Sequence, residues 1–236
     1  NKIGKIDLPE KKVLLMNLIE KLRYGENPHQ KSALYSQKNE LNLKKIHGKS
    51  LSYNNYNDIY SALKISRTFP KNKGTVIIKH TNPCGVSILD NNFESYKSAF
   101  KCDPTSAFGG IVLCNFKISK FLAIELNKIF FEVIIGNGFD SEALKILKKK
   151  KNLRLIDASK FFFCENIKFS SINDSILLQS DDSNFFNKKD FKIVSKQKPN
   201  KLQFENLIFA FNICRFVKSN AIVIANNKST LGIGSG

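Results

Sequence analysis

Apolar residues recur along the chain in two alternating patterns. Short continuous runs predict buried strands, and longer segments in which apolar side chains return every three or four residues predict amphipathic helices. The predicted strands are 33–35, 43–47, 76–78, 111–114, 131–135, 153–157, 176–178 and 221–225. The predicted helices are 11–22, 57–68, 92–101, 119–129, 141–150 and 203–218. Asn57 or Asp58 is expected to be the N-cap of the second of these helices. This alternation predicts an α/β fold, with a mixed sheet flanked by helices.

The polar segment 158–202 interrupts the alternation. It is broken by Asn, Asp and Ser residues and holds one strand candidate, so we interpret it as a connection between two subdomains. On this interpretation residues 1–157 form the first subdomain. Residues 203–236 then form the start of a second subdomain, which ends in a glycine-rich hairpin. No internal repeat is evident in the sequence.

Composition places the chain among globular proteins. Its 236 residues are enough to bury a full core, and 42% of them are hydrophobic. The N-terminus lacks the continuous apolar core of a signal peptide, and no window approaches the length of a membrane span. The five cysteines form no CxxC pair and are odd in number, which is typical of scattered reduced thiols. We therefore expect a cytoplasmic protein without a membrane partner.

The formal net charge of +18 invites a nucleic-acid interpretation. The excess is nearly all lysine spread along the chain, whereas arginine, the preferred reader of phosphates and bases, occurs only four times. We therefore expect no specific nucleic-acid partner. A basic RNA-binding module remains the alternative, and salt titration separates the two because scattered lysines give only steep, sequence-blind salt dependence.

The stretch 76–85 (VIIKHTNPCG) places two chemically active side chains at the end of a buried strand, where ligands bind in open α/β sheets. Lys79 supplies a cation with three donors, and His80 supplies a base. Residues 82–85 are expected to form the turn that follows. Neighbours on a strand point to opposite faces, so a turn that begins at His80 is needed to direct both side chains into one site. Alternatively, Lys79 is a solvated strand end and His80 a hydrogen-bonded core residue.

A second polar stretch, residues 22–30 (LRYGENPHQ), follows the first predicted helix. It combines a guanidinium, the phenol of Tyr24, an imidazole and amides, which suit a phosphorylated ligand. Arg23 can hold a phosphate through two parallel hydrogen bonds. The alternative is a helix C-terminus, with Gly25 as its cap and Pro28 preventing continuation. Both roles can hold at once.

Three further positions carry weaker signals. Gly109, with its neighbouring glycine, enters a predicted strand and allows a ligand to approach the backbone closely, although adjacent glycines also mark ordinary turns. Glu132 stands among apolar residues, where a carboxylate is costly unless it is paired or at the strand end. Asn220 lies between a predicted helix and a strand, where its amide can reach a ligand or the residue can cap the helix in a left-handed conformation.

Four motifs together resemble one family, the AICAR transformylase domain of the bifunctional purine biosynthesis protein. They are LRYGENPHQ (22–30), KHTNPCG (79–85), DPTSAFGG (103–110) and KSNA (218–221), in the family's order and approximate spacing. The end of the chain, LGIGSG (231–236), is similar to the family's Gly-Ile-Gly-Ala-Gly stretch.

The resemblance implies a function and a fold. The family moves a formyl group from 10-formyltetrahydrofolate to the 5-amino group of AICAR, giving FAICAR in de novo purine (IMP) biosynthesis. Its fold is made of paired cytidine-deaminase-like α/β subdomains without their zinc, and this sequence also lacks the corresponding zinc motifs. We therefore expect a cytidine-deaminase-like mixed sheet, no metal, AICAR and folate as small-molecule partners, and a homodimer.

The same resemblance implies the site residues. Lys79 and His80 match the catalytic pair. The positions that match nucleotide-contacting or pocket-lining residues are Arg23, Tyr24, Gly109, Glu132 and Asn220. In such a site His80 takes the proton of the weakly nucleophilic amine, and Lys79 stabilises the oxyanion of the tetrahedral intermediate.

The sequence also departs from the family's pattern. Gly136 and Asn137 stand where the family usually has Ala-Pro. The family's cyclohydrolase domain precedes the matched region, and its transformylase domain continues beyond the position of Gly236 with further folate and phosphate contacts. We therefore interpret the chain as a fragment of the family architecture. The alternative function is a truncated, non-catalytic remnant that folds or dimerises and binds AICAR weakly.

Overall fold

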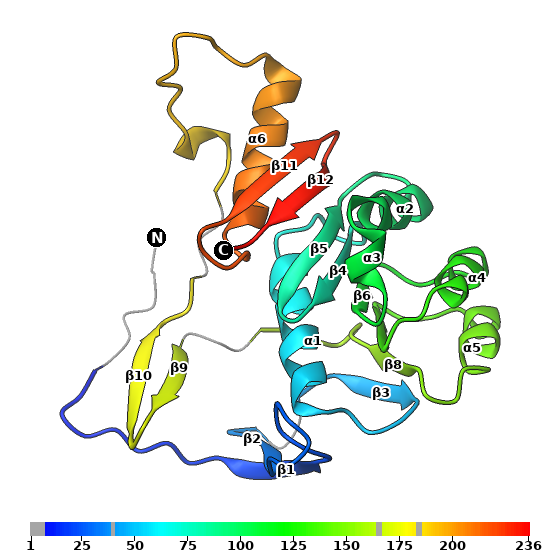
Figure 1. The fold of residues 1–236 in the computed structure, drawn as a ribbon, viewed down its shortest axis with the longest axis vertical. Coiled ribbons are helices and arrows are strands. Elements are labelled where there is room, and N and C mark those ends of the chain that lie inside the picture. The colour runs from blue at the N-terminus through cyan, green and yellow to red at the C-terminus, as the bar shows by residue number, and fades with distance from the viewer. Residues whose placement is uncertain (1–7, 39–40, 164–166, 183–185) are drawn as a thin grey trace.

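The computed structural model describes residues 8–38, 41–163, 167–182 and 186–236. Its centre is an eight-stranded sheet with the order β11-β12-β5-β4-β6-β7-β8-β3 (Figure 1). The strands are β3 (Lys44–His47), β4 (Thr75–Lys79), β5 (Asn82–Ser87), β6 (Ile111–Cys114), β7 (Val133–Gly136), β8 (Arg154–Asp157), β11 (Ile222–Asn226) and β12 (Ser229–Gly234). Strands β6, β7 and β8 are parallel, and the other neighbours pair antiparallel. The prediction of a mixed sheet is confirmed.

Helices cover both faces of the sheet (Figure 1). They are α1 (Tyr53–Ser66), α2 (Asn92–Cys102), α3 (Pro104–Ala107), α4 (Lys120–Lys128), α5 (Ser141–Leu147) and α6 (Lys201–Cys214), with a short 3₁₀ turn η1 (Lys188–Asp190). One core lies between the sheet and α2, α3, α4 and α5, and the other lies between the sheet and α1 and α6. In the part of the chain that the structure describes, no helix has the length and apolar character needed to cross a bilayer.

The continuous apolar runs arise because the central strands are buried on both faces. In β4, Ile77 enters the core under α2 and α4, whereas Val76 and Ile78 enter the core under α1 and α6. All three side chains are fully buried. A strand that faces two cores cannot alternate apolar and polar residues, so the continuous runs predicted these strands well.

Helix α1 begins four residues earlier than predicted. Its N-cap is Ser52, whose hydroxyl accepts the backbone N–H of Asn55 at 3.2 Å, while the Asn55 side chain accepts the backbone N–H of Ser52. This reciprocal capping box satisfies two otherwise unpaired donors. The predicted caps, Asn57 and Asp58, therefore lie inside the helix. The bounds of α2, α4, α5 and α6 lie within four residues of those predicted.

The predicted N-terminal helix 11–22 is wrong. Residues 17–22 form strand β1 (Asn17–Leu22), which pairs antiparallel with β2 (Ser32–Ser36) through an irregular register. The helical period of the leucines is real, but a window of this length is marginal as a helix without packing of its apolar face. Leu15 and Leu18 are both exposed, so no such packing occurs. Pairing with β2 determines the structure instead.

The predicted turn at residues 82–85 is also wrong, because these residues open strand β5. The turn is one step earlier, at His80 and Thr81, and Lys79 pairs with Asn82 across it. Pro83 is tolerated in the strand because it pairs with Ile78 at a register irregularity. Strand β12 pairs with β5 only at the far end, so Pro83 faces no second ladder.

The predicted connection 158–202 contains more structure than its composition suggested. The predicted strand 176–178 is confirmed within β10 (Ser175–Ser180), which forms a two-stranded ribbon with β9 (Ile167–Ile172). Strand β9 was missed because it is interrupted by lysine and serines. Asn173 makes the tight turn between the two strands, at φ +51°. The sequence signal for this turn was the asparagine itself, because asparagine tolerates the left-handed conformation.

The cysteines that the structure describes are unpaired thiols, as predicted. Burial raises the pKa of the Cys114 thiol to about 12. Burial, and secondarily the charge of Asp103, raises the pKa of Cys84 to about 12 as well. Neither thiol is therefore an effective nucleophile near neutral pH. Cys164 lies outside the described residues.

Candidate active site

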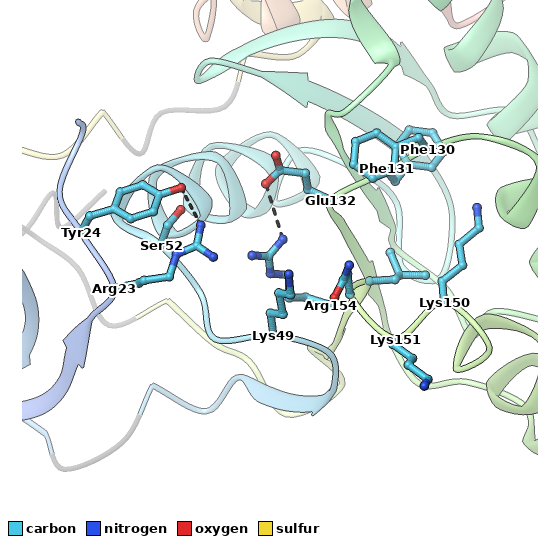
Figure 2. Close-up of a pocket in the computed structure, with 12 residues that line it drawn as sticks. Arg23, Tyr24, Lys49, Ser52, Phe130, Phe131, Glu132, Lys150, Lys151 and Arg154 are labelled. Atoms are coloured by element: carbon cyan, nitrogen blue, oxygen red, sulfur yellow. Dashed lines mark hydrogen bonds and ion pairs between the residues drawn. The ribbon is translucent and has the colours of Figure 1, made fainter. Parts of the chain in front are cut away.

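A pocket of about 470 Å³ opens where strands β7 and β8 begin (Figure 2). Four short segments contribute to it: the residues after β1, the loop before α1, and the residues that lead into β7 and β8. Its lining residues are Arg23, Tyr24, Lys49, Ser52, Phe130, Phe131, Glu132, Lys150, Lys151, Asn152, Leu153 and Arg154. Three of the residues predicted for the site, Arg23, Tyr24 and Glu132, thus line one pocket.

The pocket is strongly cationic, because five of its lining side chains are basic and one is acidic. The guanidinium of Arg154 is buried, with 8% of the residue exposed. Burial lowers the pKa of Arg154, the nearby charge of Arg23 lowers it further, and Glu132 opposes the shift. Two arginines that repel one another across a pocket would both be stabilised by an anion bound between them.

Glu132 lies immediately before the first residue of β7 rather than inside the strand. Its Oε2 accepts a hydrogen bond from the side-chain amide of Asn55 at 2.9 Å. The same oxygen lies 3.6 Å from a guanidinium nitrogen of Arg154 (Figure 2). The Arg154 guanidinium also donates to the carbonyl of Ser50 at 3.3 Å. The expectation that this carboxylate is paired or at a strand end is confirmed on both counts.

Arg23 and Tyr24 are held together at the edge of the pocket. The Arg23 guanidinium donates to the Tyr24 hydroxyl at 2.8 Å, and its central carbon lies 4.6 Å from the centre of the Tyr24 ring. The loop after them is closed by the Gly25 N–H, which donates to the Gln30 carbonyl at 2.8 Å. Because β1 precedes this loop, the alternative of a helix C-terminus is wrong.

His80 and Thr81 form a two-residue hairpin loop between β4 and β5. Their φ angles are +52° and +66°, the sign that a type I′ hairpin turn requires at both positions. Such conformations cost non-glycine residues about 1–3 kcal/mol each and persist only where the surroundings impose them. The turn that begins at His80 is thus confirmed. His80 is exposed, so the alternative of a core histidine is wrong.

Lys79 lies between this turn and the pocket. Its Nζ donates to the Phe108 carbonyl at 2.9 Å. The neighbouring Gly109 has φ +69°, and a Cβ there would come within 3.0 Å of the Lys79 ammonium and 3.5 Å of the Phe130 ring. Gly109 therefore leaves the space that Lys79 occupies. Phe130 also lines the pocket, so Lys79 and Gly109 lie beside it.

Asp58 connects the turn to the pocket from the side of α1. Its Oδ1 accepts the backbone N–H of Thr81 at 2.6 Å. Burial raises the pKa of Asp58, hydrogen bonds from the turn and the charge of His80 lower it, and Glu132 raises it. Asp58 is therefore within electrostatic range of both His80 and Glu132.

The structure does not bring Asn220 into the pocket. This exposed residue follows α6, whose C-cap is Arg215, and its φ is not positive, so the helix-cap alternative is wrong. The backbone N–H of Lys218 donates to the Asn82 side chain at 3.2 Å. The segment that carries Asn220 therefore lies beside the first residue of β5, next to the His80–Thr81 turn.

Sequence reasoning missed three residues that organise this region: Arg154, Asn55 and Asp58. Arg154 carried a signal, because it is one of four arginines and stands directly before the apolar pair Leu155 and Ile156. Asn55 stands in a polar stretch before the predicted helix, and Asp58 is predicted only as a candidate N-cap of that helix, so neither pattern indicates a role in the site. Among the described residues, no three His, Cys, Asp or Glu side chains lie together as ligands for a metal ion.

Comparison with known proteins identifies relatives along nearly the whole chain. The model of the AICARFT/IMPCHase bienzyme family matches residues 3–236. The bifunctional purine biosynthesis protein PurH of Caldicellulosiruptor saccharolyticus is 41% identical over 245 residues, covering 99% of this chain and 47% of that protein. The proteins of the same name from a Thermoanaerobacter species and from Acetivibrio thermocellus are 41% and 38% identical, and the matches cover 46% and 47% of their lengths. The chain therefore spans about half the length of the curated relatives it matches.

Proposed function

This chain belongs to the AICARFT/IMPCHase bienzyme family, and from that premise we propose that it carries out formyl transfer in purine (IMP) biosynthesis. The formyl group of 10-formyltetrahydrofolate passes to the 5-amino group of AICAR and gives FAICAR. The observation that carries the proposal is the cationic pocket of Arg23 and Arg154, which opens beside the Lys79–His80 turn.

The phosphate of AICAR binds in this pocket between the two guanidinium groups. Arginine suits this task because its planar fork matches phosphate oxygens with two parallel hydrogen bonds. Tyr24 orients Arg23 through the bond at 2.8 Å, and its hydroxyl can also donate to the phosphate. Glu132 limits the site to one anion, because its own charge opposes a second one close to Arg154.

The reaction takes place at the turn. His80 removes the proton of the AICAR amine as the nitrogen attacks the formyl carbon, and the pair of electrons of the carbonyl moves to its oxygen. Lys79 stabilises that oxyanion with its ammonium group. The carbon–nitrogen bond to the folate then breaks, and the folate nitrogen takes up a proton as it leaves. Gly109 keeps the space around Lys79 open.

Asn220 contacts AICAR from the segment between α6 and β11. The chain divides into a first subdomain 1–157, a connection 158–202 and part of a second subdomain, 203–236. Two copies form a homodimer. The ribbon β9–β10 exposes apolar side chains, including Phe169, Ile172 and Ile176. Exposed apolar side chains of this kind support a protein–protein interface at the ribbon.

Arg23→Lys tests the phosphate contact. We expect AICAR to bind more weakly by about 1–3 kcal/mol, or about 5- to 150-fold, because lysine keeps the charge but cannot form two parallel hydrogen bonds. Isothermal titration calorimetry measures the dissociation constant. Arg67→Lys, at an arginine outside this pocket, is the matched control and should leave affinity unchanged. An unchanged dissociation constant in Arg23→Lys would remove Arg23 from the site.

A further inference from the structure

The carboxylate of Asp58 faces the His80–Thr81 turn from the second turn of α1. Its Oδ1 accepts the Thr81 N–H at 2.6 Å, and it also interacts with the backbone N–H of His80. Thr81 is β-branched, and such residues rarely adopt a φ of +66°. A hydrogen bond to a charged acceptor is stronger than one to a neutral acceptor. Asp58 is therefore a direct restraint on a backbone conformation that the turn would not adopt by itself.

The same face of α1 also reaches the pocket. Asn55 precedes Asp58 by three residues, so the two side chains are neighbours on the helix surface. Asn55 is buried and donates to Glu132 at 2.9 Å. One rigid helix, fixed at its start by the Ser52 capping box, thus sets the position of the His80 turn relative to the pocket.

Charge gives Asp58 a second effect. When His80 accepts a proton it becomes an imidazolium, and Asp58 is an acidic group within electrostatic range of it. The charged groups around Asp58 are His80 on the turn and Glu132 before β7, and Lys79 ends the adjoining strand. A base that is oriented and stabilised by a third group is a recurrent arrangement in catalysis.

We propose that Asp58 is a positioning residue, which holds the His80–Thr81 turn so that the His80 imidazole is directed at the amine of bound AICAR. The role of His80 in this statement rests on the proposed function, whereas the restraint on the turn does not. Asp58 itself touches no reacting atom.

Three variants separate the contributions of Asp58. Asp58→Ala removes the acceptor, Asp58→Asn keeps an oxygen acceptor but removes the charge, and Asn57→Ala changes the exposed neighbour on the same helix as a control. Hydrogen exchange of the Thr81 amide is followed by NMR on the 236-residue chain. We expect exchange at least tenfold faster in Asp58→Ala, a smaller increase in Asp58→Asn, because its neutral oxygen is a weaker acceptor, and exchange close to wild type in Asn57→Ala. Should Asp58→Ala not fold, Asp58→Ser, whose shorter side chain cannot reach Thr81, replaces it with the same expectation.

A titration with AICAR tests the positioning role. The His80 ring resonance, assigned by comparison with His80→Ala, should shift on binding in wild type, Asp58→Asn and Asn57→Ala. It should not shift in Asp58→Ala, although the Arg23 side-chain signal still responds to the nucleotide. Wild-type exchange at Thr81 in Asp58→Ala overturns the restraint, and a normal His80 response there reduces Asp58 to a structural residue. If AICAR leaves His80 unmoved even in wild type, the proposed function fails, while the exchange data still decide the restraint.

Discussion

Replacement of Gly85 by alanine is expected to destabilise the chain by more than about 4 kcal/mol, a large part of the 5–15 kcal/mol that stabilises a typical domain. A Cβ at Gly85 would lie 1.8 Å from the carbonyl oxygen of Ala99 and 2.8 Å from its carbonyl carbon. Both atoms belong to the backbone of α2, so no side-chain rotation can relieve the overlap. Helix α2 and strand β5 would have to separate, and the core between them would open.

Urea denaturation followed by circular dichroism measures this loss. Gly234→Ala is the matched control, because a Cβ on this strand glycine meets nothing within 4 Å. We expect the control to change the free energy of unfolding by less than about 0.5 kcal/mol. A Gly85→Ala protein as stable as the control would mean that α2 does not approach β5 as closely as the structure shows.

His80→Ala is expected to lower the rate of formyl transfer by about 10²–10⁴, the usual effect of losing a general base. AICAR binding should change much less, because proton removal matters mainly in the transition state. Lys79→Ala should be comparably severe, with circular dichroism showing an intact fold. The rate is measured on the full-length protein, with AICAR and 10-formyltetrahydrofolate both supplied as substrates.

His29→Ala is the informative comparison for this prediction. His29 lies in the loop that carries Arg23 and is the other histidine near ligand-like groups, so its loss should leave the rate within a few-fold of wild type. Near-normal turnover in His80→Ala would show that the turn is only a hairpin end. A large loss in His29→Ala instead would move the base to the nucleotide loop.

Much of the central sheet could be predicted because its strands face two cores. The run at β6 (Ile111–Cys114) was predicted to the residue, since four consecutive apolar residues after two glycines are too few for a helix and suit a strand buried on both faces. At β1, pairing with β2 overrode a helical period. At β5, a proline and a glycine that usually signal a turn occupy a strand, because one lies at a register irregularity and the other lies against α2.

Only those residues of the candidate site that lie in short recognisable motifs could be predicted from the sequence. Lys79, His80, Arg23 and Tyr24 stand in short stretches whose chemistry is recognisable without a structure. The residues that join those stretches act over long sequence separations. Asp58 meets Thr81 across 23 residues, and Asn55 meets Glu132 across 77 residues. Such contacts depend on how α1 packs on the sheet, which no local pattern encodes.

The central claim is that the pocket of Arg23 and Arg154 holds the phosphate of AICAR beside His80. Its most direct test is calorimetric titration of the 236-residue chain with AICAR and, in parallel, with the riboside that lacks the phosphate. We expect saturable binding of one AICAR per chain and at least tenfold weaker binding of the riboside, because a lost charge-assisted contact exceeds about 1.4 kcal/mol. Equal affinity for the two compounds, or no binding of AICAR, would contradict the account.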